Sequence, residues 1–189
     1  MIETALGTSI AFTAPHRLAT KAGFDILEAG GTAVEAMVAA AAQIAVVYPH
    51  MNSIGGDGFW LIKKTDQSPV AISACGPAAQ RATPEWYERK GYKSFLPTRG
   101  PLAALTVPGT IAGWKLALEL DNPKRAVPLN ELLSAAVERA KNGVAVTKNQ
   151  HETLAAKKHE LVSVSGFKDF YLDKGHEPEV GSKLLQTKL

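Results

Sequence analysis

Residues 48–62 read Tyr-Pro-His-Met-Asn-Ser-Ile-Gly-Gly-Asp-Gly-Phe-Trp-Leu-Ile, and the rest of the chain is organised around this stretch. A long apolar segment predicted as a helix leads into it, and a predicted apolar strand leads out of it. Between them, Gly55, Gly56 and Gly58 fit a turn whose backbone needs φ > 0 or a close approach by another group. Asp57 either caps a tight helix-to-strand connection or lines a site, and composition alone leaves both interpretations open.

The composition is that of one globular domain with a buried core. The 189 residues are 46% hydrophobic and 21% charged. The net charge of +3 is mild and the basic residues are scattered, so the sequence has neither a nucleic-acid footprint nor a polybasic membrane patch. Glu35 and Gln43 interrupt the most apolar run, residues 33–47, which therefore fits a buried helix and not a membrane span. We expect neither nucleic acid nor membrane as a partner.

Cys75 is the single cysteine, which excludes an internal disulfide and is compatible with a reducing compartment. The N-terminus lacks the basic-then-apolar pattern of a signal peptide. We therefore expect a cytoplasmic protein.

The first half of the chain predicts two helices and a hairpin. A strand over residues 9–14 precedes a helix that ends at Gly30-Gly31. Thr32 is placed to cap the next helix, Ala33 to Val47, and Glu35 completes a capping box. Residues 59–63 and 70–74 then alternate as two strands, with a turn at residues 66–69, which is typical of a hairpin.

The second half predicts mainly helices. Thr83-Pro84 opens a short helix, residues 91–101 form a loop and residues 102–107 a strand. Further helices are expected from Thr110 to about residue 120, over 131–142 and over 148–159. The chain is expected to be loop-like from Gly166 onward, and residues 181–189 resemble the approach to another helix. The class is α+β with packed layers, and residues 1–189 are expected to form a single incomplete domain.

Residue chemistry alone gives no convincing nucleophile and base. The five histidines lack metal-ligand spacing, so no metal is expected, and no cofactor is indicated. The glycine turn leads into a strand and not into a helix, so the helix N-terminus that would hold phosphate is on the wrong side. Cys75 would need a base to act as a nucleophile and is better interpreted as a small buried side chain. Either the protein is not an enzyme or its catalytic groups lie elsewhere.

The motifs nevertheless resemble one enzyme family in order and spacing over nearly the whole chain. The string Ala14-Pro15-His16-Arg17-Leu18-Ala19-Thr20 and the following Gly23-x-x-Ile26-Leu27-x-Ala29-Gly30-Gly31 look like the start of a gamma-glutamyltransferase large subunit. Ile54-Gly55-Gly56-Asp57-Gly58-Phe59, Val107-Pro108-Gly109-Thr110 and the helix after Pro128-Leu129 are similar to later segments of that subunit.

This resemblance implies an N-terminal nucleophile hydrolase with an αββα sandwich, made by a proenzyme that cleaves itself. The family's nucleophile is a threonine at the start of the small subunit, whose own amine serves as base and which forms an acyl-enzyme from an amide. That residue would lie beyond Leu189. The implied partners are therefore the C-terminal remainder of the large subunit, the small subunit with its threonine, and a small-molecule amide, and no catalytic residue is expected in this chain.

One position departs from the family. Where the transferases have an Arg-Glu pair after the second strand of the hairpin, this chain has Cys75-Gly76, so the cation that grips the glutamyl α-carboxylate is absent. Arg81 is a weak substitute because it falls where the next helix begins. The small-residue version looks more like the oxamate amidohydrolase branch. We expect residues 54–58 and 73–76 to lie at the site, with Asp57, Ser73, Cys75 and Gly76 as substrate-binding candidates, although His50 and Asp57 also fit structural roles in turns.

Three functions remain open on the sequence. The chain belongs to a small-amide hydrolase, to a gamma-glutamyltransferase or glutathione hydrolase proper, or it is a truncated, catalytically silent product. Turnover of oxamate against turnover of glutathione separates the first two, and a downstream reading frame that starts with threonine counts against the third. Expressed alone, the chain is expected to be poorly soluble or to aggregate, because the apolar helix over residues 33–47 would lack part of its cover.

Overall fold

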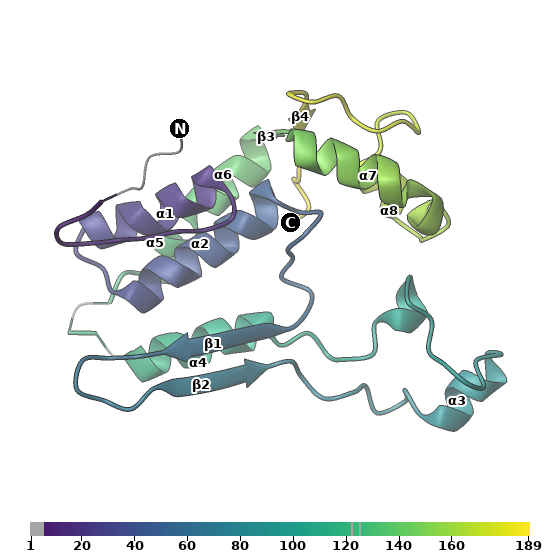
Figure 1. The fold of residues 1–189 in the computed structure, drawn as a ribbon, viewed down its shortest axis with the longest axis horizontal. Coiled ribbons are helices and arrows are strands. Elements are labelled where there is room, and N and C mark those ends of the chain that lie inside the picture. The colour runs from purple at the N-terminus through teal and green to yellow at the C-terminus, as the bar shows by residue number, and fades with distance from the viewer. Residues whose placement is uncertain (1–5, 122, 125) are drawn as a thin grey trace.

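The computed structural model describes residues 6–121, 123–124 and 126–189. The chain folds into helices and two small antiparallel sheets, as expected for an α+β class (Figure 1). The first elements in chain order are α1 (Arg17–Glu28), α2 (Ala33–Val47), β1 (Gly58–Ile62), β2 (Val70–Ala74), α3 (Pro84–Arg89), the 3₁₀ turn η1 (Pro101–Ala103) and α4 (Thr110–Asp121). They are followed by α5 (Leu129–Leu132), α6 (Ser134–Asn142), β3 (Val144–Ala145), α7 (Lys148–Leu161), α8 (Phe167–Tyr171) and β4 (Lys183–Leu184).

Helices α1 and α2 form the best-buried part of the molecule. The predicted capping box is present: Thr32 Oγ1 accepts from Glu35 N at 3.1 Å, and Glu35 Oε2 accepts from Thr32 N at 2.8 Å. The many alanines of α2 let α1, α4 and α6 approach it closely, and its side chains join Trp114 and Leu132 in the main core. The prediction of a buried helix over residues 33–47 is confirmed to the residue. The expectation that this helix would lack part of its cover is wrong, because eleven of its fifteen residues are buried within this chain.

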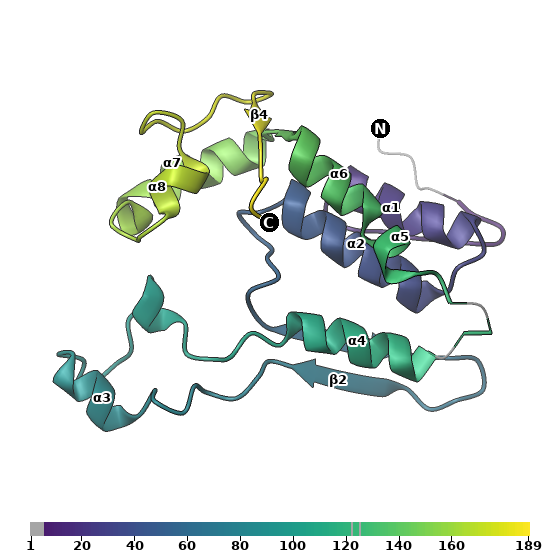
Figure 2. The same cartoon turned by 180° about the vertical axis from the view of Figure 1, so that it is seen from behind.

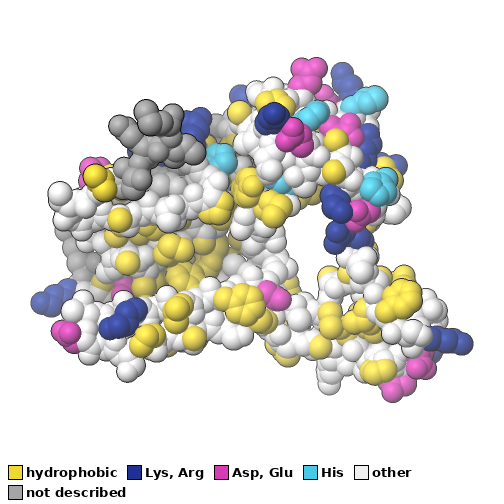
Figure 3. Space-filling model, viewed as in Figure 1, with side chains coloured by type: hydrophobic (Ala, Val, Ile, Leu, Met, Phe, Trp, Pro, Cys, Tyr) yellow, Lys and Arg dark blue, Asp and Glu magenta, His cyan; other side chains and the backbone are white. Residues whose placement is uncertain are grey.

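The β1–β2 hairpin has one covered face and one open face. The strands pair antiparallel from Gly58 opposite Ala74 to Ile62 opposite Val70. Trp60, Ile62 and Ile72 point to the inner side and pack against α4 and α2, where Gly113 leaves room for Ala74 and the indole of Trp60. Figure 3 shows hydrophobic side chains gathered over the hairpin on the side that faces the viewer.

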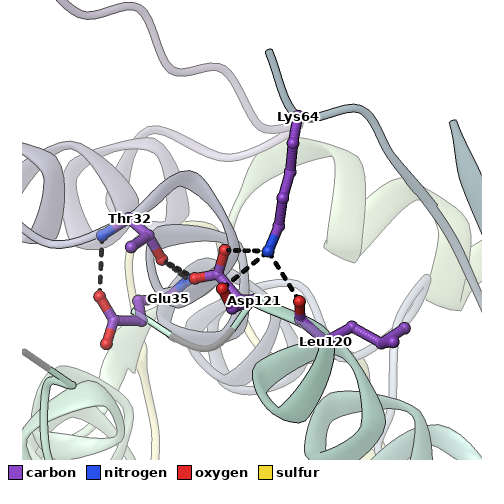
Figure 4. Close-up of polar contacts among 5 residues, drawn as sticks. All are labelled: Thr32, Glu35, Lys64, Leu120 and Asp121. Carbon is purple, nitrogen blue, oxygen red and sulfur yellow. Dashed lines mark hydrogen bonds and ion pairs between the residues drawn. The ribbon is translucent and has the colours of Figure 1, made fainter. Parts of the chain in front are cut away.

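A polar latch fixes the far end of the hairpin to the helices (Figure 4). Lys64 Nζ donates to the carbonyl oxygens of Leu120 and Asp121, both at 2.7 Å, at the C-terminus of α4, where a cation is favourable. The carboxylate of Asp121 lies 3.7 Å from the same ammonium and accepts a hydrogen bond from Thr32 Oγ1. The N-terminus of α2, the C-terminus of α4 and the hairpin are therefore held at one point.

Residues 75–109 leave the hairpin as a long arm that carries α3 and η1 and then return to α4 (Figure 2). Helices α7 and α8 extend on the same side of the molecule, and an opening lies between them and the arm (Figure 3). Arg99 Nε of the arm donates to Glu160 Oε2 of α7 at 2.9 Å, so the two extensions touch at their tips.

Two predicted strands were wrong, and one predicted helix is interrupted. Residues 9–14 alternate in burial as a strand would, but they belong to neither sheet of the described chain, and Phe12 instead packs on Gly23 of α1. Residues 102–107 form η1 and one bridge, Thr106 with Ala78, in place of a strand. The predicted helix over 131–142 is interrupted at Leu133, where Ser134 Oγ donates a hydrogen bond to the Glu131 carbonyl oxygen at 2.7 Å.

The C-terminal quarter also differs from the prediction. Residues expected as loop form α8, which is held by the buried ring of Phe167 and by a 2.9 Å hydrogen bond from Tyr171 Oη to the Pro49 carbonyl. The segment expected to lead into a helix pairs instead as β4 with β3. No helix in the described part of the chain is long and apolar enough to cross a membrane.

Candidate functional site

Three segments that are distant in sequence meet at the open end of the hairpin. They are the glycine turn before β1, the residues after β2, and the segment that returns from the arm into α4. The carbonyl of Gly56 accepts from Gly109 N at 3.2 Å, from Thr110 N at 3.1 Å and from Thr110 Oγ1 at 2.7 Å. Val107 N donates to the Pro77 carbonyl at 2.9 Å and ties the third segment to the second. The motifs singled out in the sequence thus lie side by side.

Two glycines make this meeting possible. Gly76 has φ +64°, and a Cβ there would lie 1.9 Å from the Val107 carbonyl oxygen. A Cβ on Gly109 would lie 2.2 Å from the carbonyl oxygen of Ala74. Only glycine lets these backbones approach so closely. Gly76, predicted as substrate-binding, therefore has a clear structural role at the site.

The other three predicted site residues share one face of the hairpin. Side chains alternate across a strand, so Phe59 and Leu61 face the same side as their partners Ser73 and Ala71. Asp57 and Cys75 directly adjoin the two strands at the same end of the hairpin and continue this alternation. We call this set the hairpin outer face; it consists of Asp57, Phe59, Leu61, Ala71, Ser73 and Cys75. Ser73 Oγ lies 3.4 Å from Cys75 Sγ, as expected for neighbours on one face. Asp57, Ser73 and Cys75 form its polar end and Phe59, Leu61 and Ala71 its apolar end.

Asp57 is exposed and is held by a residue that the sequence analysis missed. Thr106 Oγ1 donates to Asp57 Oδ1 at 3.1 Å. Thr106 directly precedes the Val-Pro-Gly segment, and that adjacency was the only sequence signal that could have found it. Its bridge to Ala78 brings it beside the hairpin end, so the arm fixes the orientation of the carboxylate.

The polar end of the outer face contains a thiol, a hydroxyl and a carboxylate, but in the described part of the chain the carboxylate is hydrogen-bonded to neither the thiol nor the hydroxyl. Among the described residues, Cys75 Sγ contacts Ser73 Oγ, and neither atom forms a hydrogen bond to a histidine. Cys75 is half-buried and not enclosed as the sequence suggested. Arg81 lies exposed in the turn before α3 and takes part in none of the hydrogen bonds or ion pairs found in the described part.

The histidines have local roles away from this face. His16 caps α1 through Nδ1, which accepts from Leu18 N at 3.2 Å, and burial, then Arg17 and His50, lower the pKa of its imidazole. His50 Nε2 lies 2.7 Å from Asn149 Oδ1, which also accepts from Tyr48 Oη at 2.8 Å. Within the described residues no group of three His, Cys, Asp or Glu side chains is arranged to hold a metal ion.

Comparison with known proteins places these features in a family. The family model described as gamma-glutamyltranspeptidase matches residues 19–189. The oxamate amidohydrolase proenzyme of Klebsiella pneumoniae is 48% identical over 178 residues, which is 93% of this chain and 33% of that protein. The glutathione hydrolase-like YwrD proenzyme of Bacillus subtilis is 34% identical, over 100% of this chain and 35% of that protein. The glutathione hydrolase proenzyme of Escherichia coli is 30% identical, over 90% of this chain and 29% of that protein.

Solved structures give the same picture. Helicobacter pylori gamma-glutamyltranspeptidase superposes with a TM-score of 0.80 at 28% identity, over 100% of this chain and 53% of that one. Cephalosporin acylase from Bacillus halodurans superposes with a TM-score of 0.78 at 30% identity, over 90% of this chain and 32% of that one. The chain spans about a third of the length of these curated relatives.

Proposed function

Because this chain belongs to the gamma-glutamyltranspeptidase family of enzymes and adopts part of its α+β N-terminal nucleophile hydrolase fold, we propose that it is the N-terminal part of the large subunit of a self-processing amidohydrolase. The proposed substrate is a small amide such as oxamate. Residues 1–189 would then form one incomplete domain, completed by the remainder of the large subunit and by the small subunit.

The observation that carries this proposal is a site that is built but half-covered. Hydrogen bonds and glycine contacts lock three loops together at the hairpin end, yet the face that carries Asp57, Ser73 and Cys75 is open. Beside them Phe59 and Leu61 are 73% and 77% exposed, which is unusual for neighbouring large apolar side chains on a strand. A second sheet laid on this face would bury the two apolar side chains and enclose the polar end.

The nucleophile would come from that covering part. The family resemblance assigns it to a threonine whose amine takes the hydroxyl proton; attack on the amide carbonyl releases the amine and leaves an acyl-enzyme, which water hydrolyses. In this arrangement the present chain supplies one wall of the pocket. This chain then needs no nucleophile and base of its own, because the covering part supplies both.

The wall favours a smaller substrate than a gamma-glutamyl compound. Cys75 and Gly76 stand where the transferases, by the family resemblance, carry a guanidinium for the α-carboxylate, and the described polar end formed by Asp57, Ser73 and Cys75 contains no cation. Without a bidentate charged contact, a glutamyl group loses a large part of its recognition. The 48% identity to a protein named oxamate amidohydrolase supports the same choice.

A gamma-glutamyltransferase or glutathione hydrolase is the second candidate, favoured by the relatives named glutathione hydrolase. A truncated, silent product is the third. A cytoplasmic location stays a prediction from the lone cysteine and the N-terminal sequence.

The first experiment is to sequence the gene past the codon for Leu189 and to record a mass spectrum of the protein from its source. A second polypeptide that starts with threonine supports the proposal. A lone chain that ends at Leu189 overturns it in favour of the silent product. The processed protein is then assayed with oxamate and with glutathione; turnover of glutathione alone would move the assignment to the second candidate.

A further inference from the structure

The polar end of the hairpin outer face, made of Asp57, Ser73 and Cys75, carries one formal charge, and that charge is negative. Of these three side chains only Asp57 is ionisable to an anion at neutral pH, and Cys75-Gly76 supply no cation beside it. A substrate that enters between this face and its cover therefore meets a carboxylate at the polar end.

The Asp57 carboxylate is oriented and has a free acceptor. Its Oδ1 accepts from Thr106 Oγ1 at 3.1 Å. Its second oxygen, Oδ2, accepts no hydrogen bond from the described residues, and the side chain is exposed. An ionised carboxylate can accept from about four donor positions, so this oxygen is available to a ligand that presents an N–H group.

We propose that Asp57 orients the substrate by accepting a hydrogen bond from the amide N–H₂ group and by repelling the substrate's carboxylate toward the covering part of the enzyme. This inference rests on the proposed function and deepens it. A small amide acid such as oxamate has a donor end and an anionic end. Only the donor end is compatible with a fixed carboxylate, so a cation that binds the anionic end would have to lie on the side of the substrate away from Asp57.

The same residue discriminates between substrate and product. Hydrolysis breaks the C–N bond, water supplies the oxygen, and the amide becomes a second carboxylate while ammonia leaves. The group that accepted a hydrogen bond from the amide then faces an anion, because two carboxylates at close range repel each other. Asp57 thus favours binding of the amide acid and release of the dicarboxylate.

The test compares three variants of the processed enzyme. Asp57→Asn keeps an oxygen for Thr106 but removes the charge. Asp66→Asn is the matched control, because it makes the same change in the same hairpin at the opposite end; Asp66 has φ +57°, which asparagine tolerates. Thr106→Val removes only the hydrogen bond that holds Asp57.

For Asp57→Asn we expect kcat/KM for oxamate to fall about 10- to 100-fold, mainly through KM, as for the loss of one charged hydrogen bond. Inhibition by oxalate should become about tenfold tighter, because the repulsion is gone. Asp66→Asn should change neither quantity. Thr106→Val should weaken oxamate binding less and leave the oxalate constant within about twofold.

Two results would overturn the inference in an enzyme that hydrolyses oxamate. One is that Asp57→Asn behaves as Asp66→Asn. The other is that Asp57→Asn and Thr106→Val lose the same activity with unchanged oxalate inhibition, which would make Asp57 a purely structural tie. A parent enzyme that hydrolyses no small amide would instead overturn the proposed function and this inference together, so the two failures are distinguishable.

Discussion

Helix α2 and the two strands of the β1–β2 hairpin are both strongly apolar in sequence but differ in how this chain covers them. Helix α2 buries eleven of its fifteen residues, including the carboxylate of Glu35. Strand β1 alternates, and its two large outward side chains, Phe59 and Leu61, are among the most exposed hydrophobic residues. The helical layer therefore completes its own core within this chain, whereas one face of the hairpin stays open. The candidate site lies on the unfinished side.

The largest effect is expected from a substitution that disrupts the hairpin end and leaves the helices unchanged. We expect Gly76→Ala to destabilise the chain by about 3–5 kcal/mol, because a Cβ at φ +64° would also collide with the Val107 carbonyl. Gly30→Ala is the control: it has φ +89° with open space around it and should cost about 1 kcal/mol. Urea denaturation measures both, and equal losses would contradict the close approach at Gly76.

Substitutions on the two faces of the hairpin test whether one face is covered and the other is open. Ile72→Ala on the covered face should cost about 3 kcal/mol, as for a buried aliphatic truncation. Phe59→Ala on the open face should cost about 0.5 kcal/mol or less in this chain.

In the complete enzyme the small effect of Phe59→Ala should become a large one. Phe59→Ala should then weaken association with the covering part, measured by co-purification of the two subunits. If Phe59→Ala destabilises the isolated chain as much as Ile72→Ala, the outer face is not open and the half-covered site is wrong.

Within the helical layer, Glu35 tests whether that layer depends on polar groups supplied by the same chain. Its carboxylate is 1% exposed and accepts from Thr32 N at 2.8 Å and from Val127 N at 2.6 Å. We expect Glu35→Ala to cost about 2 kcal/mol, because it removes a capping box and leaves two partly buried N–H groups, of Thr32 and Val127, without this partner. Glu35→Gln keeps one acceptor and should cost about half as much. Equal melting temperatures for all three proteins would contradict this role.

The smallest effect is expected where the arm meets α7. Hydrogen bonds from Lys157 and then Arg99 hold the pKa of Glu160 below its usual value. A lowered folded-state pKa means that the stabilisation is present above the unfolded pKa and is lost as the pH falls through the folded pKa. The pair is exposed, so the effect should be slight and should fade with salt. An NMR titration of Glu160 in the parent and in Arg99→Gln checks it; an unchanged titration would remove the contact between the two extensions.

The sequence predicted best where structure depends on local contacts. The Thr32–Glu35 capping box, helix α2, the hairpin and the proline start of α3 each follow from residues within one turn of one another. It failed where distant residues decide. Residues 9–14 have strand alternation but no partner strand in the described chain, and α8 exists because Phe167 is buried and Tyr171 reaches Pro49.

The family could be recognised from the sequence alone, because motif identity and spacing are properties of the chain. The substrate-binding role of Asp57, Ser73, Cys75 and Gly76 stays a prediction. Only the tertiary structure decided that Asp57, Ser73 and Cys75 share one open face, that Thr106 holds Asp57, and that Gly76 must lack a side chain. These facts depend on the return of residues 106–110 to the hairpin over a long arm. No local pattern encodes that return; it is specified by backbone hydrogen bonds and close packing between segments far apart in sequence.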